Sequence, residues 1–104
     1  MPITDMIGQE INKDDLVLAQ ISISYQDCGK RTISSHAIGR VLDVMPASGT
    51  TVALVRFEVV WLRETDFTVQ FMKHQGGAKI KKQLAHFSVF KVNEKDIKKY
   101  LRNS

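Results

Sequence analysis

The side chains that could bind a metal ion are those of Cys28, His36, His74 and His86. Zinc sites are marked in a sequence by two pairs of ligands, with the two members of each pair only a few residues apart. No two of these four residues form such a pair, so their spacing does not predict a metal site.

Nucleophilic catalysis requires a cysteine or serine beside a histidine that an acidic side chain orients. Ser34-Ser35-His36 brings hydroxyl groups near an imidazole, but nothing around it resembles the strained turn that exposes a catalytic serine. Gly76-Gly77 lacks the Gly-Lys-Ser/Thr ending of a phosphate-binding loop. We therefore expect a protein that is not an enzyme and has no catalytic, cofactor or metal site.

The strongest chemical signal is a basic C-terminal third. Residues 1–70 contain six Lys or Arg and nine Asp or Glu, whereas residues 71–104 contain nine Lys or Arg and two acids. The candidate nucleic-acid-binding residues are Lys73, His74, Lys79, Lys81, Lys82, Lys95, Lys98, Lys99 and Arg102. Each lysine or arginine that meets a phosphate releases counterions, and this release drives binding that is independent of base sequence. The alternative stays open that these residues only solubilise the protein and protect exposed strand edges from aggregation.

The elements that must position these residues are mainly strands. Alternating hydrophobic residues predict strands at about 16–25, 35–45, 51–62, 67–72 and 79–92, the last one broken near residue 84. A change of phase near Ala19-Gln20 predicts a bulge or a bend there. Gly76-Gly77 predicts a tight hairpin turn, whose tip would carry the first five basic candidates. Asn93 and the acids after it predict the start of a helix at about 94–102.

The segment 51–62 has the clearest alternation. Val55, Phe57, Val59 and Trp61 fall on one face of the predicted strand, so we expect all four to point into the core. Gly39, near the middle of the preceding strand, is expected either to adopt a positive φ or to pack against another backbone segment.

The composition is that of one ordinary globular domain, covering residues 1–104. The chain is 43% hydrophobic and 25% charged, and its lone Cys28 cannot form an intramolecular disulfide. No stretch approaches the roughly 20 apolar residues that span a bilayer, and the N-terminal residues lack a secretory leader pattern. We therefore expect a cytoplasmic protein that does not bind membranes.

Three short patterns in residues 13–62 suggest a known architecture. They are Asp15-x-Val17, Ile38-Gly39-x-Val41-x-Asp43-Val44 and Val52-x-Leu54-x-Arg56-Phe57. Together they resemble the small SH3-like barrels of the KOW and Tudor type, in which a glycine opens a sharply turning strand. The resemblance implies an all-β, antiparallel barrel of five to six strands, here with one C-terminal helix. Such barrels include RNA, DNA and protein binders, so the resemblance does not select the partner.

Two functions are compatible with these features. The leading hypothesis is a non-catalytic module that contacts the phosphates of DNA or RNA through the basic hairpin and the C-terminal helix. The alternative is a small protein-interaction module, a regulator or inhibitor, that docks on an acidic surface of a partner protein.

Overall fold

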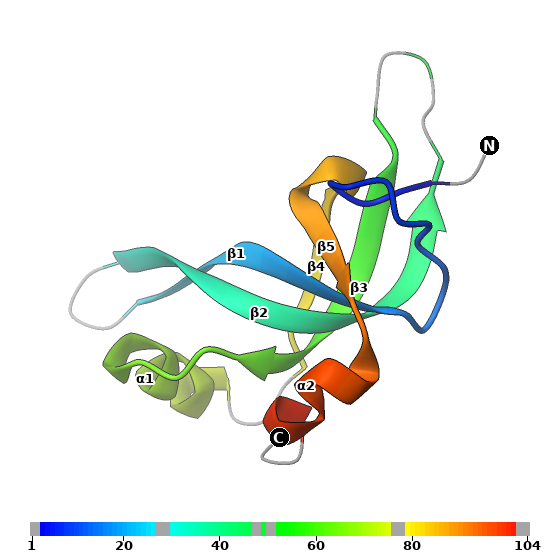
Figure 1. Ribbon diagram of the computed structural model, residues 1–104. Coiled ribbons are helices and arrows are strands. Elements are labelled where there is room, and N and C mark those ends of the chain that lie inside the picture. Colours follow the sequence, from blue (N-terminus) through cyan, green and yellow to red (C-terminus); the bar gives the residue numbers. More distant parts are fainter. Residues whose placement is uncertain (1–2, 27–29, 47–48, 50–51, 76–78, 102–104) are drawn as a thin grey trace.

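The computed structural model describes residues 3–26, 30–46, 49, 52–75 and 79–101, and it contains one five-stranded sheet and two helices (Figure 1). The chain forms β1 (Leu16–Gln26), β2 (Lys30–Met45), β3 (Leu54–Leu62), α1 (Asp66–Gln75), β4 (Lys81–Ala85), a 3-10 turn (His86–Ser88), β5 (Val89–Val92) and α2 (Glu94–Leu101). The strand order is β4-β3-β2-β1-β5, and all neighbouring strands are antiparallel. The predicted all-β class with a short C-terminal helix is confirmed.

The sheet is open between its edge strands, β4 and β5. Within the described ranges no ladder of backbone hydrogen bonds joins these two strands, so the closed barrel remains an expectation. β5 pairs with β1 only from Leu16 to Ala19. Beyond that point, Nζ of Lys82 in β4 donates a 2.8 Å hydrogen bond to the backbone oxygen of Ser22. A side chain therefore bridges β4 and the part of β1 that β5 leaves uncovered.

The segment 67–72, predicted to be a strand, lies in helix α1. Phe67 and Phe71 are four residues apart, so the apolar residues that suggest a strand also suit one helical face. The helix start decides between the two, because Thr65 and Thr68 cap each other. Oγ1 of Thr65 accepts from N–H of Thr68 at 3.1 Å, and Oγ1 of Thr68 accepts from N–H of Thr65 at 2.7 Å. The predicted hairpin is therefore wrong as well; Gly76-Gly77 itself lies outside the described residues.

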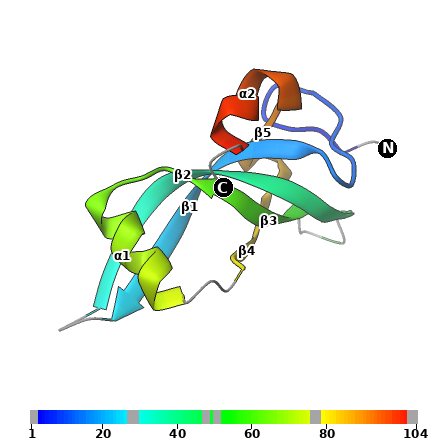
Figure 2. The same ribbon diagram turned by 90° about the horizontal axis from the view of Figure 1, so that it is seen from below.

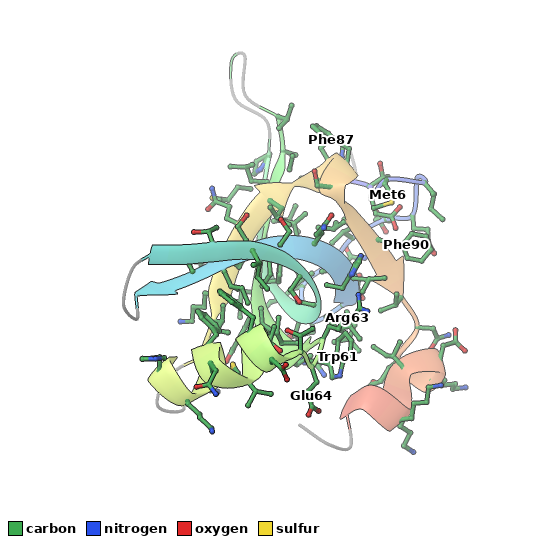
Figure 3. The ribbon with its side chains drawn as sticks, turned by 90° about the vertical axis from the view of Figure 1, so that its left-hand side faces the viewer. Met6, Trp61, Arg63, Glu64, Phe87 and Phe90 are labelled. Atoms are coloured by element: carbon green, nitrogen blue, oxygen red, sulfur yellow. The ribbon has the colours of Figure 1, made fainter. Side chains whose placement is uncertain are left out.

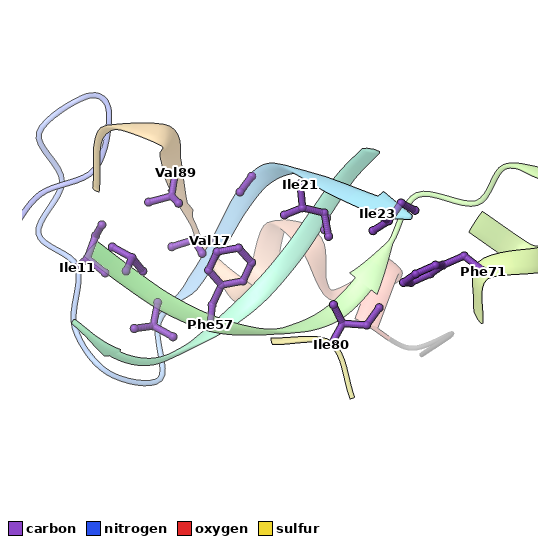
Figure 4. Close-up of a cluster of buried hydrophobic side chains, with 12 residues drawn as sticks. Ile11, Val17, Ile21, Ile23, Phe57, Phe71, Ile80 and Val89 are labelled. Atoms are coloured by element: carbon purple, nitrogen blue, oxygen red, sulfur yellow. The ribbon is translucent and has the colours of Figure 1, made fainter. Parts of the chain in front are cut away.

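The two helices pack on opposite faces of the sheet (Figure 2). On the inner face, Phe71 of α1 joins the main hydrophobic core, which includes the fully buried Val17 and Phe57 (Figure 4). On the outer face, Ile97 of α2 packs with Leu16 in a second, smaller cluster. Leu16 and Val17 are consecutive in β1, so their side chains point to opposite faces of the strand, as sheet geometry requires.

A β-bulge in β3 turns Trp61 away from the main core. Ile38 pairs with Trp61 and Gly39 pairs with Val59, so Val60 is an extra residue in β3. Val59 stays against the inner-face core, whereas Trp61 is half-buried beside the outer-face cluster. The prediction that Trp61 shares one face with Phe57 is therefore wrong.

No bulge lies near Ala19-Gln20, so the first of the two features expected there is absent from β1. β1 pairs with β2 without interruption from Leu16↔Arg40 to Gln26↔Lys30. The change of phase in the sequence has a different cause: both faces of β1 are covered near Leu16 and Val17, whereas only the inner face is buried at Ile21 and Ile23.

Candidate functional site

The basic candidates do not form one surface. Lys73 and His74 lie in the last turn of α1, and Lys79, Lys81 and Lys82 lie just before or in β4. Lys95, Lys98 and Lys99 are exposed on α2, and Arg102 lies outside the described residues. Because α1 and α2 cover opposite faces of the sheet, Lys73 and His74 lie apart from the lysines of α2. Lys81 lies opposite Glu58 in the edge strand β4. We call the residues of α1 and β4, with Lys79, the α1–β4 group, and those of α2 the α2 group.

Contacts within the protein engage part of the α1–β4 group. Nζ of Lys79 lies 3.3 Å from Oε1 of Glu58, and Lys82 donates to the backbone oxygen of Ser22. Lys73 and Lys81 are exposed, and neither forms an ion pair within the described part of the chain. Lys73 and Lys81 are therefore the members of this group that can reach a partner without first breaking such a contact.

The α2 group lies beside the outer face of the sheet. Asn93 caps the helix, with its Oδ1 accepting from N–H of Lys95 at 2.9 Å, and Ile97 anchors the helix through the outer-face cluster. Glu94 lies 3.8 Å from the guanidinium of Arg40. Lys95 and Lys98 project into solvent without an ion pair in the described residues.

The outer face is hollowed around Leu18 and Phe90, the pair that follows Leu16↔Val92 along the β1–β5 ladder. The hollow has a volume of about 520 Å³. Its principal lining residues are Met6, Leu18, Gln20, His36, Ser88 and Phe90. Among the described residues that line it, none is acidic. We call this cavity the outer-face hollow; Figure 3 shows Met6 and Phe90 close together, with Phe87 above them and Arg63 and Trp61 below, toward α2.

Sequence analysis missed this hollow because segments distant in sequence build it. Gln20 and His36 come from paired strands, and Leu18 is paired with Phe90. The 3-10 turn interrupts the alternation before β5 and leaves Phe87 55% exposed. The sequence signal that could have predicted the hollow is Leu18. It is an apolar residue on the outer face of β1, where the following side chains, those of Gln20, Ser22 and Ser24, are polar.

The histidines and serines considered for catalysis lie apart. Ser35 is buried on the inner face, and its Oγ has no hydrogen-bond partner among the described residues, whereas its neighbour His36 is exposed on the outer face. Nδ1 of His86 lies 2.7 Å from the backbone oxygen of Thr4. The described ranges contain no group of three or more His, Cys, Asp or Glu residues suited to a metal ion, and Cys28 lies outside them.

A buried carboxylate fixes the loop that carries Met6 beside the hollow. Asp5 accepts backbone hydrogen bonds from Ile7 (3.1 Å), Gln9 (2.8 Å) and Lys91 (2.7 Å), and a side-chain bond from Gln9 (3.0 Å). Burial of the carboxyl raises the pKa of Asp5, but these hydrogen bonds outweigh it and hold the pKa below its ordinary value of 3.8. The charged form of Asp5 therefore ties the N-terminal loop to β5.

The stability of the protein should accordingly fall at acid pH. The folded-state pKa of Asp5 is depressed, so its contribution is present above pH 3.8 and is lost as pH falls through the folded value. Asp5→Asn places an amide donor against the N–H groups of Gln9 and Lys91 and should cost about 1–2 kcal/mol near neutral pH. Urea unfolding from pH 7 to pH 3 measures both effects. The exposed Asp14→Asn is the matched control, and equal acid sensitivity of D5N and the unmutated protein would contradict this role.

Comparison with known proteins adds no relative: no family model, curated protein or solved structure matches this chain. Neither of the two helices described is long and apolar enough to cross a bilayer.

Proposed function

We propose that the protein is a non-catalytic module that binds nucleic acid through phosphate contacts from its C-terminal helix. The observation that carries this proposal is the position of α2. Its lysines are exposed to solvent, and Ile97 packs the helix against the outer-face cluster. Lysine side chains on a fixed helix can meet successive phosphates without ordering a flexible segment first.

The α1–β4 group has a secondary role in this proposal. Lys79 and Lys82 already have partners in Glu58 and Ser22, so a phosphate would have to replace those contacts. Lys73 and Lys81 add to the positive field that attracts a polyanion. Lys73 lies on α1, which covers the opposite face from α2, and Lys81 lies in β4, at the opposite edge of the sheet from β5, the strand that α2 follows. We therefore expect them to influence association more weakly than the α2 lysines.

The strand order supports the SH3-like resemblance as part of this proposal. The five strands follow the order β4-β3-β2-β1-β5 and are all antiparallel, which is compatible with the five-stranded antiparallel architecture that the resemblance implies. A shared architecture does not select a partner, so the proposed function depends on the surface and not on the fold.

A protein partner is the second candidate, and one specific observation favours it. Met6, Ile7 and Phe87 are all at least half exposed, on the N-terminal loop and on the 3-10 turn. Exposed apolar side chains of this kind are typical of protein-docking surfaces. Heparin and salt should displace a nucleic acid, whereas a partner buried around these apolar residues should persist in both.

Two double variants with the same loss of charge test the proposal. Lys95→Gln with Lys98→Gln should weaken nucleic-acid binding and flatten the slope of log K against log salt by about 0.7–0.9 per lost contact. Lys73→Gln with Lys81→Gln is the matched control and should have the smaller effect. Fluorescence anisotropy with a labelled oligonucleotide over a salt series measures both. Equal effects of the two pairs would show that net charge, and not α2, determines binding.

A further inference from the structure

We infer that the outer-face hollow receives an unpaired base, so that the nucleic acid bound by this protein is single-stranded. This inference rests on the proposed function and specifies its ligand. The lining of the hollow is the first reason. Leu18 and Phe90 supply apolar and aromatic surface, while Gln20, His36 and Ser88 supply hydrogen-bonding groups.

This combination suits a planar heteroaromatic group. A base needs an apolar or aromatic surface to stack on and hydrogen-bonding partners for its edge, and it carries no charge. None of the described lining residues is a carboxylate, which would repel the phosphates attached to the base. The volume of about 520 Å³ falls within the usual range for small-ligand sites.

Two segments that carry cationic residues lie near the hollow, and none of the described residues that line it is itself a lysine or arginine. On the first side is α2: Ile97 packs over the Leu16↔Val92 end of the β1–β5 ladder, and the Leu18↔Phe90 pair follows along the same two strands. On the second side is Arg63, whose backbone N–H donates a 3.0 Å hydrogen bond to the backbone oxygen of His36. The side chain of Arg63 is exposed, and Glu64 is the acidic neighbour in the chain.

The arrangement therefore places segments with candidate phosphate-binding groups on two sides of a cavity that is large enough for a base and has no acidic residue among its described lining. In a duplex the bases are stacked and paired, so none can enter the hollow without being extruded. In a single strand the bases are free to leave the stack, which makes single-stranded DNA or RNA the ligand that both parts of this surface can bind together.

Trp61, the chain's single tryptophan, provides a direct readout. Trp61 pairs with Ile38, and Ile38 pairs with Leu18 of the hollow, so Trp61 and Leu18 lie two strands apart on the outer face. Two strand spacings correspond to roughly 10 Å between their backbones. A base in the hollow should change Trp61 emission. Inorganic polyphosphate, which has no bases, should compete for the lysines without that change.

The experiment titrates the full chain with a short single-stranded oligonucleotide, with the duplex of the same sequence and with inorganic polyphosphate. We expect the single strand to bind more tightly than the duplex. Phe90→Leu should weaken single-strand binding about tenfold, the effect of losing one stacked base. Ser22→Ala, the next exposed position along β1 beyond Gln20, should leave binding unchanged. Melting temperatures establish that each variant is folded.

Gln20→Ala provides a second variant, because Gln20 is exposed and its loss should not affect folding. It should weaken single-strand binding by about two- to tenfold, as for one lost hydrogen bond. If the protein binds but F90L and Q20A change nothing, or if duplex binds as tightly, the inference is overturned and the phosphate proposal stands. A protein side chain would then be the better occupant. If no nucleic acid binds, the proposed function itself fails.

Discussion

Replacing Phe57 by alanine should lower the free energy of unfolding by about 3–5 kcal/mol. The ring is fully buried in the inner-face core, so its removal loses apolar burial and leaves a cavity that the paired strands around it cannot fill by moving. Domains of this size are stable by about 5–15 kcal/mol, so the variant should lose a large part of its stability. The midpoint and slope of urea unfolding measure the loss.

Phe87→Ala is the matched control for this prediction. It removes the same side chain from a position that is 55% exposed, so its effect on stability should stay within about 0.5 kcal/mol. Similar losses for the two variants would contradict the placement of Phe57 at the centre of the core.

Replacing Gly39 by valine should lower the free energy of unfolding by about 3 kcal/mol or more. The reason differs from the one expected from the sequence. Among the described glycines, Gly8 and Gly49 have positive φ, and Gly39 does not. A Cβ at Gly39 would lie 2.8 Å from Cγ of Phe57 and still nearer to its Cδ2, and that ring is fully buried and cannot move aside. Gly39 is therefore required by a neighbouring side chain, not by its backbone conformation.

A double-mutant cycle tests that cause. Gly39→Ala should destabilise the protein in the same direction as valine, and Phe57→Leu should remove part of the ring that obstructs the new methyl group. The loss in the double variant should then be smaller than the two single losses together, by about 0.5–3 kcal/mol as for residues in contact. Thermal and urea unfolding supply the values. Additive losses would show that Gly39 and Phe57 are not coupled.

The sequence pattern predicted the elements whose conformation depends on residues close together in the chain. The alternation in 54–62 identifies β3, and the Asn93 cap with its following acids identifies α2. The segment 67–72 shows the limit, because residues 67, 69 and 71 fit a strand and residues 67 and 71 also fit a helix. The reciprocal Thr65–Thr68 cap favours the helix, and Phe71 then reaches the core as a helical residue.

The candidate site was only partly predictable. The basic residues can be read from the sequence, but the separation of those on α1 from those on α2 follows from which side of the sheet each helix covers. Phe71 places α1 on the inner face and Ile97 places α2 on the outer face, each through contacts with strands that are distant in the sequence. The hollow depends on Asp5 holding the N-terminal loop to Lys91 of β5, a contact across 86 residues.

The salt dependence of nucleic-acid binding by the unmutated protein tests the central claim most directly. Anisotropy of a labelled single strand and of a labelled duplex should report binding to the single strand at low salt. The slope of log K against log salt should be about −0.7 for each phosphate contact on a single strand. The lysines of α2 should supply at least two of those contacts. An absence of binding to either probe at low salt would contradict the claim and leave a protein partner as the surviving explanation of this surface.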